Sequence, residues 1–449
     1  MRKAMALMLA LSVLLLCACG KEPPPPEKKW WAGFGTAELA LPENSEEPLY
    51  IAGYHSGWKI SGVLDLQQVR ALWLSDGDAA VLLLVVDCIG LSSGTVNQIR
   101  QALSDFCRRT GCDGVQVVST HTHAGVDTLG LWGPMAMDGK NKDFMNGLLD
   151  GAVSAAEEAY ADRCAGTLSY AVRRTQNLQI DSRAPAVYDE NLYQLRFVPE
   201  DCQNNGIRLV SFAAHAEALR GDNTQVSRDF PGVVCDLIGA ETGEDVLFLP
   251  GAIGGLILTP ELTGNAFDPV ENARLTGRAI ADAALSVRAW KPLEPELALS
   301  TVRFETPLEN TIFLYYKFLG ILDNQVRQSL AGTYYLQTEL TVMGMGDFFM
   351  ALFPGEVFPE LISGTGTAAD PRPLEDIAAE YGLETWMAVG LANDEIGYIL
   401  PPSDYVLHDQ LPFFREAEGD HYEETNSVGR DCAQDLANAF EKALQVLAG

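Results

Sequence analysis

The stretch Val115-Gln116-Val117-Val118-Ser119-Thr120-His121-Thr122-His123 decides how the rest of the chain is interpreted. It begins as an apolar run typical of a buried strand and ends in two of the chain's 6 histidines, one residue apart. Residues i and i+2 of an extended segment point to the same side, so His121 and His123 would turn both imidazoles into one cavity. Zn²⁺ takes such nitrogen ligands. Two histidines bonded to backbone carbonyls at a strand edge are the alternative that this stretch alone leaves open.

Outward from this stretch, strand and helix patterns alternate. Ala79–Asp87 is an unbroken apolar run closing on an acid, which predicts a strand buried on both faces. Apolar residues at three- and four-residue spacing predict helices over Thr95–Arg109 and Lys142–Tyr160. Further strands are expected at 166–173, 192–197, 207–214, 246–249, 296–306, 334–353 and 385–391, and further helices at 269–287 and 431–447. The pattern predicts an α/β (α+β) fold, with a mixed central β-sheet covered by helices in a single large domain.

The first residues form a processing segment rather than part of that domain. After a positively charged start, the apolar run Ala4–Leu16 is too short to span a membrane comfortably. It leads into Leu16-Cys17-Ala18-Cys19-Gly20, which resembles a bacterial lipobox. We predict a lipoprotein signal peptide over residues 1–19 and a lipid on Cys19. An ordinary cleaved signal peptide with an incidental cysteine is the alternative.

A proline-rich polar tether is predicted over residues 20–30, followed by the globular body over residues 31–449. A lipid anchor, a spacer and a body predict an extracytoplasmic protein attached to the bacterial cell membrane. The formal net charge of −30 argues against binding nucleic acid or anionic lipid through the body, because both need clustered Lys and Arg. The same negative charge favours the binding of a cation.

The cysteines predict no thiolate metal site. Without Cys17 and Cys19, seven of the chain's 9 cysteines remain (9 − 2), so they cannot all pair internally, and none forms Cys-x-x-Cys. We expect most of them to be small buried apolar side chains. Cys107 and Cys112 flank a short turn and are candidates for a disulfide, which their spacing does not decide.

Three more strands end in unexpected polar side chains. One apolar strand closes on His215, another leads through a Pro-Gly turn to Glu356, and a third leads to Tyr398. Each residue alone has an ordinary structural explanation. Their repetition favours a common site, because active sites of sheet proteins gather at strand ends and in the loops that follow.

Other short pieces accompany these strand ends. In order along the chain they are Ala32-Gly33-Phe34-Gly35-Thr36-Ala37, Gly53-Tyr54, Gly62-Val63-Leu64-Asp65, Val86-Asp87, Ser119-Thr120-His121-Thr122-His123-Ala124-Gly125, Ser182-Arg183-Ala184-Pro185, Ala214-His215, Asp229-Phe230-Pro231-Gly232, Gly251-Ala252-Ile253-Gly254-Gly255, Pro354-Gly355-Glu356, Gly397-Tyr398 and His421-Tyr422-Glu423. In this order and spacing, along nearly the whole body, they resemble the N-terminal catalytic domain of the neutral/alkaline (non-lysosomal) ceramidases.

The resemblance implies a zinc ion bound by His121, His215, Glu356 and Tyr398. Two neutral imidazoles, a carboxylate and a phenol suit Zn²⁺ and leave one position open for water. His123 would then act beside the ligands, as a proton shuttle or as a hydrogen-bond donor to the developing oxyanion.

The resemblance also assigns roles to two residues outside the ligand set. Tyr422 matches a tyrosine that contacts the scissile amide. Arg183 matches an arginine near the pocket, with a substrate-orienting or oxyanion role. The reaction implied is hydrolysis of an N-acyl amide, in which a zinc-activated water attacks the acyl carbonyl and the amine leaves. For the ceramidases the substrate is an N-acyl sphingoid base, which predicts a lipid-like partner and a place in sphingolipid metabolism.

The chain departs from the family pattern in two places. Gly254-Gly255-Leu256-Ile257-Leu258 stands where ceramidases usually carry Gly-Asp or Gly-Asn followed by Ser-Pro, so an Asp and a Ser with an assigned catalytic role are absent. This difference puts ceramide itself in question as the substrate. Ceramidases also usually continue into an immunoglobulin-like β domain, where this sequence ends in a predicted helix. We expect the lipid anchor to supply membrane proximity instead.

Two alternatives to an N-acyl amidase stay open. One is a surface lipoprotein with the same fold that binds a ligand without turnover, and the other is a metal-dependent hydrolase of another ester or amide, such as a peptidoglycan-type amide. The pocket distinguishes them, since an apolar tunnel favours a lipid acyl chain and a wide polar cleft favours a sugar or peptide.

Overall fold

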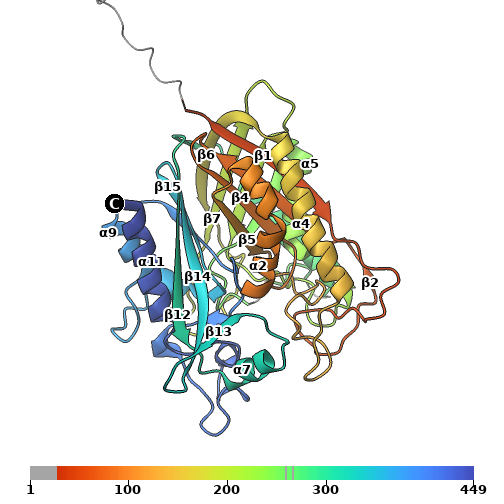
Figure 1. The fold of residues 1–449 in the computed structure, drawn as a ribbon, viewed down its shortest axis with the longest axis vertical. Helices are drawn as coiled ribbons and strands as arrows, with labels where there is room; N and C mark the ends of the chain where they lie inside the picture. Colours follow the sequence, from red (N-terminus) through yellow and green to blue (C-terminus); the bar gives the residue numbers. More distant parts are fainter. Residues whose placement is uncertain (1–27, 258–259, 265–266, 449) are drawn as a thin grey trace, which may run out of the picture.

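The computed structural model describes residues 28–257, 260–264 and 267–448 (Figure 1). The predicted signal peptide, Cys19 and most of the predicted tether lie outside these residues. The last tether residue does not behave as predicted. Trp30 begins strand β1 (Trp30–Glu38), its side chain is 2% exposed, and its indole N–H donates to the carbonyl of Leu293 at 2.8 Å. Trp30 therefore belongs to the sheet rather than to the tether.

A nine-stranded mixed sheet forms the larger half of the domain. In spatial order its strands are β10 (Asp245–Pro250), β8 (Ile207–Phe212), β7 (Asn191–Pro199), β6 (Cys164–Arg174), β1, β3 (Gln68–Ser75), β4 (Ala80–Val86) and β5 (Gly114–Ser119), with β11 (Lys291–Leu293) beside β6. The pairs β4–β5 and β8–β10 are parallel and the others are antiparallel. Within each parallel pair, the carboxyl ends of the two strands and the loops that follow them therefore lie at the same edge of the sheet.

A second, five-stranded sheet packs face to face against the first. Its strands are β12 (Leu297–Pro307), β14 (Tyr334–Met345), β15 (Phe348–Leu352) and β17 (Trp386–Val389), with β13 (Gln325–Gln328) beside β14. Two short parallel pairs complete the strands, namely β16 (Glu356–Val357) with β18 (Tyr398–Ile399), and β2 (Gly62–Val63) with β9 (Gln225–Val226).

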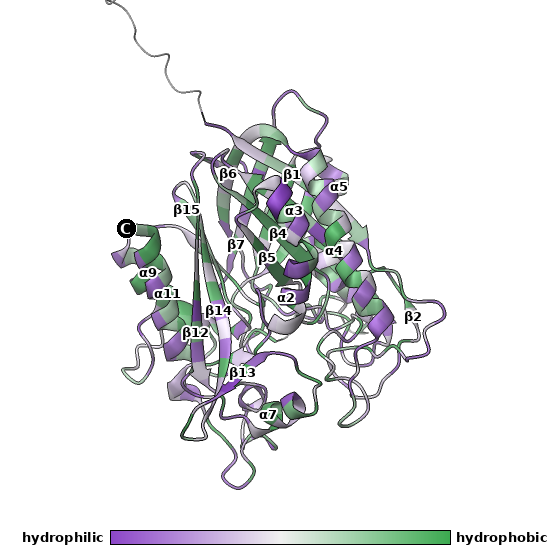
Figure 2. Ribbon diagram, viewed as in Figure 1, coloured by the Kyte–Doolittle hydropathy of each residue, from purple (hydrophilic) through white to green (hydrophobic). Residues whose placement is uncertain are grey.

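Helices cover the outer face of each sheet (Figure 1). The large sheet is covered by α2 (Ser93–Ala102), α3 (Ser104–Thr110), α4 (Lys142–Asp162), α5 (Asp229–Thr242) and α6 (Pro269–Leu285). The small sheet is covered by α8 (Pro359–Ser363), α9 (Leu374–Glu380) and α11 (Cys432–Ala448). Figure 2 shows hydrophobic residues concentrated along β4 and β5, whereas α4 carries both hydrophobic and hydrophilic residues. The layers are thus helix, sheet, sheet, helix.

The alternation of side chains in β3 and β4 explains why both faces of the large sheet are apolar. Leu72 and Leu83 point into the core between the two sheets, and Trp73 and Leu82 point into the core beneath the helices. Successive strand residues face opposite sides, so a strand between two apolar layers needs hydrophobic residues at every position. The predicted strand in Ala79–Asp87 is confirmed as β4.

The predicted fold class, α/β with a mixed sheet covered by helices in one domain, is confirmed, with three differences in detail. There are two sheets where one was predicted. The predicted helix Thr95–Arg109 is two helices that meet at Leu103. The predicted strand over 334–353 is the hairpin β14–β15, which turns at Gly346 with a φ of 59°, a conformation that favours glycine.

The disulfide bond in the structure is not the one that the cysteine spacing suggested. Cys164 at the start of β6 is bonded to Cys202 in the loop after β7. Cys107 and Cys112, the candidate pair, are free thiols. Within the described residues, no helix has the length and apolar character needed to cross a membrane.

Candidate metal centre

Four strand ends bring the predicted ligand residues together. His121 follows β5 and His215 follows β8, both in the large sheet, whereas Glu356 begins β16 after β15, and Tyr398 begins β18 after β17. Glu356 and Tyr398 are direct partners in the β16–β18 pair. All four residues are buried. The site therefore collects nitrogen ligands from the loops that follow two strands of the large sheet and oxygen ligands from the separate short pair β16–β18.

Backbone carbonyls orient the two predicted histidine ligands. His121 Nδ1 lies 2.6 Å from the carbonyl oxygen of Ile89, and His215 Nδ1 lies 3.0 Å from that of Leu256. A carbonyl can only accept, so each Nδ1 carries a hydrogen and each ring directs its Nε2 into the site. His121 itself has a φ of 63°, a left-handed conformation that is uncommon for a residue with a side chain and typical of functional sites.

The atoms that face one another in the site need a shared proton or a cation between them. His215 Nε2 lies 2.8 Å and His121 Nε2 lies 3.4 Å from the same oxygen of Glu356, Oε2. The Tyr398 hydroxyl is 3.5 Å from His215 Nε2. Two ligands about 2.0–2.1 Å from one tetrahedral Zn²⁺ stand about 3.3 Å apart. Acceptors at these separations fit a shared cation.

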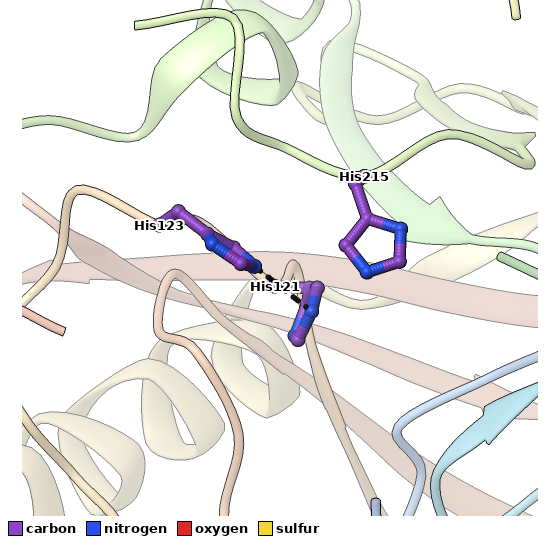
Figure 3. A group of neighbouring side chains, drawn as sticks. All are labelled: His121, His123 and His215. Atoms are coloured by element: carbon purple, nitrogen blue, oxygen red, sulfur yellow. Dashed lines mark hydrogen bonds between the residues drawn. The ribbon is translucent and has the colours of Figure 1, made fainter. Parts of the chain in front are cut away.

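His123 lies closer to this group than predicted. Its Nε2 is 3.1 Å from His121 Nε2, and nitrogens of His121, His123 and His215 all lie within 4.8 Å of one another. Figure 3 shows the three imidazoles turned toward a common space, with His121 between the other two. The candidate donor set is therefore larger than the four residues predicted.

The charges of the group follow from burial and from mutual contact. Burial alone raises the pKa of Glu356, but the His121 and His215 imidazoles beside it hold that pKa well below its usual value. Burial and the neighbouring imidazoles lower the pKa of His123 and keep this ring neutral. Burial and the charge of Glu356 raise the pKa of Tyr398 well above 10. Without a cation the site thus holds an ionised carboxylate beside a neutral His123 and a protonated phenol.

Glu217 lies beside His123 and was not singled out by the sequence. Its Oε2 accepts a hydrogen bond from the Tyr54 hydroxyl at 2.6 Å and lies 3.9 Å from His123 Nδ1. Burial raises the pKa of Glu217 to about 8. The only sequence signal was its place two residues after His215, on the same side of an extended segment.

Arg183 is bound to acidic residues rather than free to meet a substrate. Its guanidinium donates to Glu423 and to both carboxylate oxygens of Glu424, each at 3.0 Å, and to the backbone carbonyl of Asp404 at 2.7 Å. Glu423 and Glu424 lie in the short helix α10 (Tyr422–Thr425). Arg183 thereby holds the helix that carries Tyr422, and a direct contact with substrate would require it to give up one of these bonds.

Tyr422 lies at the wall of a cavity of about 170 Å³ that also reaches His121, His123, Glu356 and Tyr398. The lining also contains polar residues of the loops, among them Asn310, Thr425 and Asn426, and a set of large apolar side chains called here the apolar wall, namely Leu129, Leu131, Trp132, Ile312, Phe313 and Leu322. Ile312 and Phe313 come from α7 (Thr311–Phe318). This helix lies at the lower end of the molecule in Figure 1, near the ends of β12 and β14.

The loop that departs from the ceramidase pattern still serves the site. Leu256, in this loop, supplies the carbonyl that orients His215. A Cβ atom on Gly254 would lie 2.2 Å from the ring of Phe358, and one on Gly255 would lie 2.8 Å from Asp181 Oδ1. The backbone passes too close to its neighbours for side chains at these positions.

Comparison with known proteins identifies the fold. No family model matches the sequence, and no curated protein sequence does. The structure is similar to that of the neutral ceramidase from Pseudomonas aeruginosa, with a TM-score of 0.74 and 17% identity over 94% of this chain and 75% of that one. A second structure, a ceramidase complexed with C2, gives a TM-score of 0.72 and 15% identity over the same shares of the two chains. The chain has the fold of the neutral ceramidases.

Proposed function

We propose that this protein is a zinc-dependent hydrolase of N-acyl amide bonds, similar to the ceramidases. The observation that carries the proposal is the set of acceptors facing one another at the junction of the two sheets, His121 and His215 Nε2 against Glu356 Oε2. Only a shared proton or a cation satisfies such an arrangement, and the donor set of imidazole, carboxylate and phenol suits Zn²⁺. A ceramidase fold supports the reaction class.

The chain's own residues prepare the site for this chemistry. The carbonyls of Ile89 and Leu256 hold the His121 and His215 rings so that both Nε2 lone pairs converge with the Glu356 carboxylate. A bound Zn²⁺ would supply a Lewis acid for the acyl carbonyl and would lower the pKa of a water toward about 7.

His123 is the residue best placed to move a proton. Its low pKa leaves a neutral ring able to take up a proton at the cavity and to release it to the departing amine. Tyr422 lines the same cavity and would place its hydroxyl beside the scissile amide.

The apolar wall favours a lipid-like acyl group over a sugar or peptide. The cavity is small, and α7, which forms part of its wall, also carries Tyr315 and Phe318 with 52% and 66% of their surface exposed. A long acyl chain would run from the cavity along these aromatic side chains.

We also propose that the lipid on Cys19 holds the protein at the outer face of the bacterial membrane. Cys19→Ser should then move the protein from the detergent phase to the aqueous phase in a phase-partition assay, and its retention in the detergent phase would contradict the anchor.

The proposal is tested by metal content and turnover together. The purified protein should hold about one zinc per chain and should hydrolyse a fluorogenic N-acyl sphingosine in a chelator-sensitive manner. His121→Ala and His215→Ala should each lose both properties while keeping the far-UV circular dichroism of the parent, because each removes a ligand nitrogen. His408→Ala, which replaces a histidine outside the group, is the matched control.

Full zinc occupancy in either ligand variant would overturn the assignment. A protein that holds zinc but hydrolyses no amide or ester would favour the second candidate, a lipoprotein that binds its ligand without turnover. The observation favouring that candidate is the loop at Gly254 and Gly255, which lacks the family's Asp and Ser.

A further inference from the structure

Two cysteines flank the turn that joins α3 to β5. Cys107 lies in α3, and Cys112 lies just before β5 begins at Gly114. Both are free thiols in the structure, and both are half-buried. They stand apart from the candidate metal centre, because His121 follows the other end of β5. The pair therefore needs an explanation of its own.

The turn is a helix C-terminus of the kind that brings these two residues together. Gly111 has a φ of 71°, the left-handed conformation that reverses the chain. The N–H groups of Gly111 and Cys112 both donate to the carbonyl of Cys107, at 2.9 and 3.2 Å. In such a turn the residue after the glycine folds back onto the last turn of the helix, where an apolar contact usually forms. Here both residues of that contact are cysteines.

The side chains of the pair share one environment. Both pack against the core beneath the helices. Burial raises the pKa of both thiols, that of Cys112 to about 12, and each thiol also shifts the pKa of the other. The Cys112 thiol donates to the carbonyl of Gly114 at 3.2 Å. Both thiols are thus protonated at neutral pH and close enough to influence each other.

We propose that Cys107 and Cys112 form a site of reversible oxidation, where thiol–disulfide exchange creates a bond that ties α3 to the start of β5. A disulfide needs Cα atoms about 4.4–6.8 Å apart. The hydrogen bond from the Cys112 N–H to the Cys107 carbonyl holds the two residues at a separation of this order. The bond can therefore form without a rearrangement of the backbone.

The co-reactant is a disulfide, either a small molecule or a protein. The thiolate of one cysteine attacks it, which forms a mixed disulfide and releases one thiol. The thiolate of the other cysteine then attacks the cysteine sulfur of the mixed disulfide, which closes the Cys107–Cys112 bond and releases the second thiol. The chain loses two electrons and two protons, and the oxidant gains them. The bond between Cys164 and Cys202 favours a compartment that contains such oxidants.

Oxidised glutathione tests the site on the full folded protein, with dithiothreitol to reverse the reaction. Trypsin cuts after Arg108 and Arg109, between the two cysteines, so a Cys107–Cys112 bond joins two peptides that otherwise separate. Mass spectrometry, after alkylation of the free thiols in denaturant, should find the joined peptides in the oxidised sample, and dithiothreitol should remove them. Reduced thiols throughout, or glutathione retained on either cysteine, would overturn the proposal.

Cys107→Ser makes the test specific to this pair. Oxidation should raise the midpoint of thermal unfolding of the parent by about 2–5 °C, because a closed loop restricts the unfolded chain. The variant should show neither the joined peptides nor this rise. Cys235→Ala, at a buried cysteine of α5, is the control and should keep both. A parent protein that contains the bond but unfolds at an unchanged midpoint would contradict the tie between α3 and β5.

Discussion

Backbone carbonyls, rather than side chains, fix the orientation of the two histidines most central to the site. The carbonyl oxygens of Ile89 and Leu256 receive the Nδ1 hydrogens of His121 and His215. Replacing a side chain does not remove a carbonyl, so ring orientation should survive substitutions at both positions that leave the backbone in place. The orientation of the polar side chains beside these rings should be more sensitive to substitution, because few hydrogen bonds hold each of them.

Tyr54 and Glu217 form the contact most open to a test at this scale. Tyr54→Phe removes the hydroxyl that donates to Glu217 Oε2 at 2.6 Å, and among the described residues Glu217 Oε1 is already buried without a hydrogen-bond partner. Loss of a donor to a buried carboxyl should lower the free energy of unfolding by about 1–3 kcal/mol, measured by urea denaturation. Tyr188→Phe, at a tyrosine that is 45% exposed, should change it by less than about 0.5 kcal/mol. Equal effects of the two substitutions would rule out this role for the hydroxyl.

A common site for the candidate ligands could be predicted because each one follows an apolar strand, whereas their role as ligands was implied by the resemblance to the ceramidases. His121, His215, Glu356 and Tyr398 do lie together in the structure. Glu217 and its hydrogen-bond partner Tyr54 could not be predicted in this way. Their environment depends on residues distant in the chain, as the 163-residue separation of Tyr54 from Glu217 illustrates, and no local pattern records such a contact.

Among the secondary-structure elements, α10 is held by Arg183, with further hydrogen bonds from Ser182 and the Val406 backbone N–H. This four-residue helix is too short to be stable by itself, and its buried Glu423 and Glu424 are both held by Arg183. The geometry thus explains how Arg183 can affect Tyr422 without touching a substrate. The substrate-orienting role that the family resemblance implies stays a prediction.

Arg183→Leu separates these two roles. Removing the guanidinium leaves two carboxylates in a buried site, which should lower the free energy of unfolding by about 3–5 kcal/mol. Adding Glu424→Gln to Arg183→Leu should recover part of that loss, as measured by urea denaturation of the single and double variants. An Arg183→Leu protein of unchanged stability but reduced kcat would instead assign Arg183 to the substrate.

A helix or strand could be predicted where its apolar residues recur with a simple period on one face or on both faces. The run Ala79–Asp87 was recognised as a strand for this reason, but β1 was not, since Gly33 and Gly35 interrupt its apolar pattern. Their reason is tertiary, because a Cβ atom on Gly33 or Gly35 would lie 2.2 Å from a carbonyl oxygen of α4. The second sheet was missed for a similar reason. Strand patterns indicate that strands exist but not how many sheets they form.

At the scale of the whole molecule, the acidic composition makes the stability depend on pH. The formal net charge is −30, and several carboxyls are buried. Burial raises the pKa of Asp394 and of Glu360 to about 7 and that of Asp127 to about 6. Both the repulsion between charges and the cost of burying ionised carboxyls decrease when protons are added.

The metal-free protein should therefore be more stable at pH 5.5 than at pH 8. Carboxyls such as Asp394, whose pKa is higher in the folded than in the unfolded state, bind more protons when folded, so their contribution to stability falls as pH rises through about 6–7. Glu424 has the opposite shift, because Arg183 outweighs burial, and its contribution is lost only below about pH 4.5. Thermal unfolding in excess chelator measures the effect, and a higher midpoint at pH 8 would contradict it.

The separation of the candidate ligands along the chain has a consequence for how the protein is made. The nitrogen donors His121 and His215 come from the first half of the chain, and the oxygen donors Glu356 and Tyr398 come from the last quarter. During synthesis, a tight site for the ion cannot exist until nearly the whole chain has left the ribosome and both sheets have docked. Occupancy by the metal would thus mark molecules that are complete, and nascent or truncated chains would not compete for the ion.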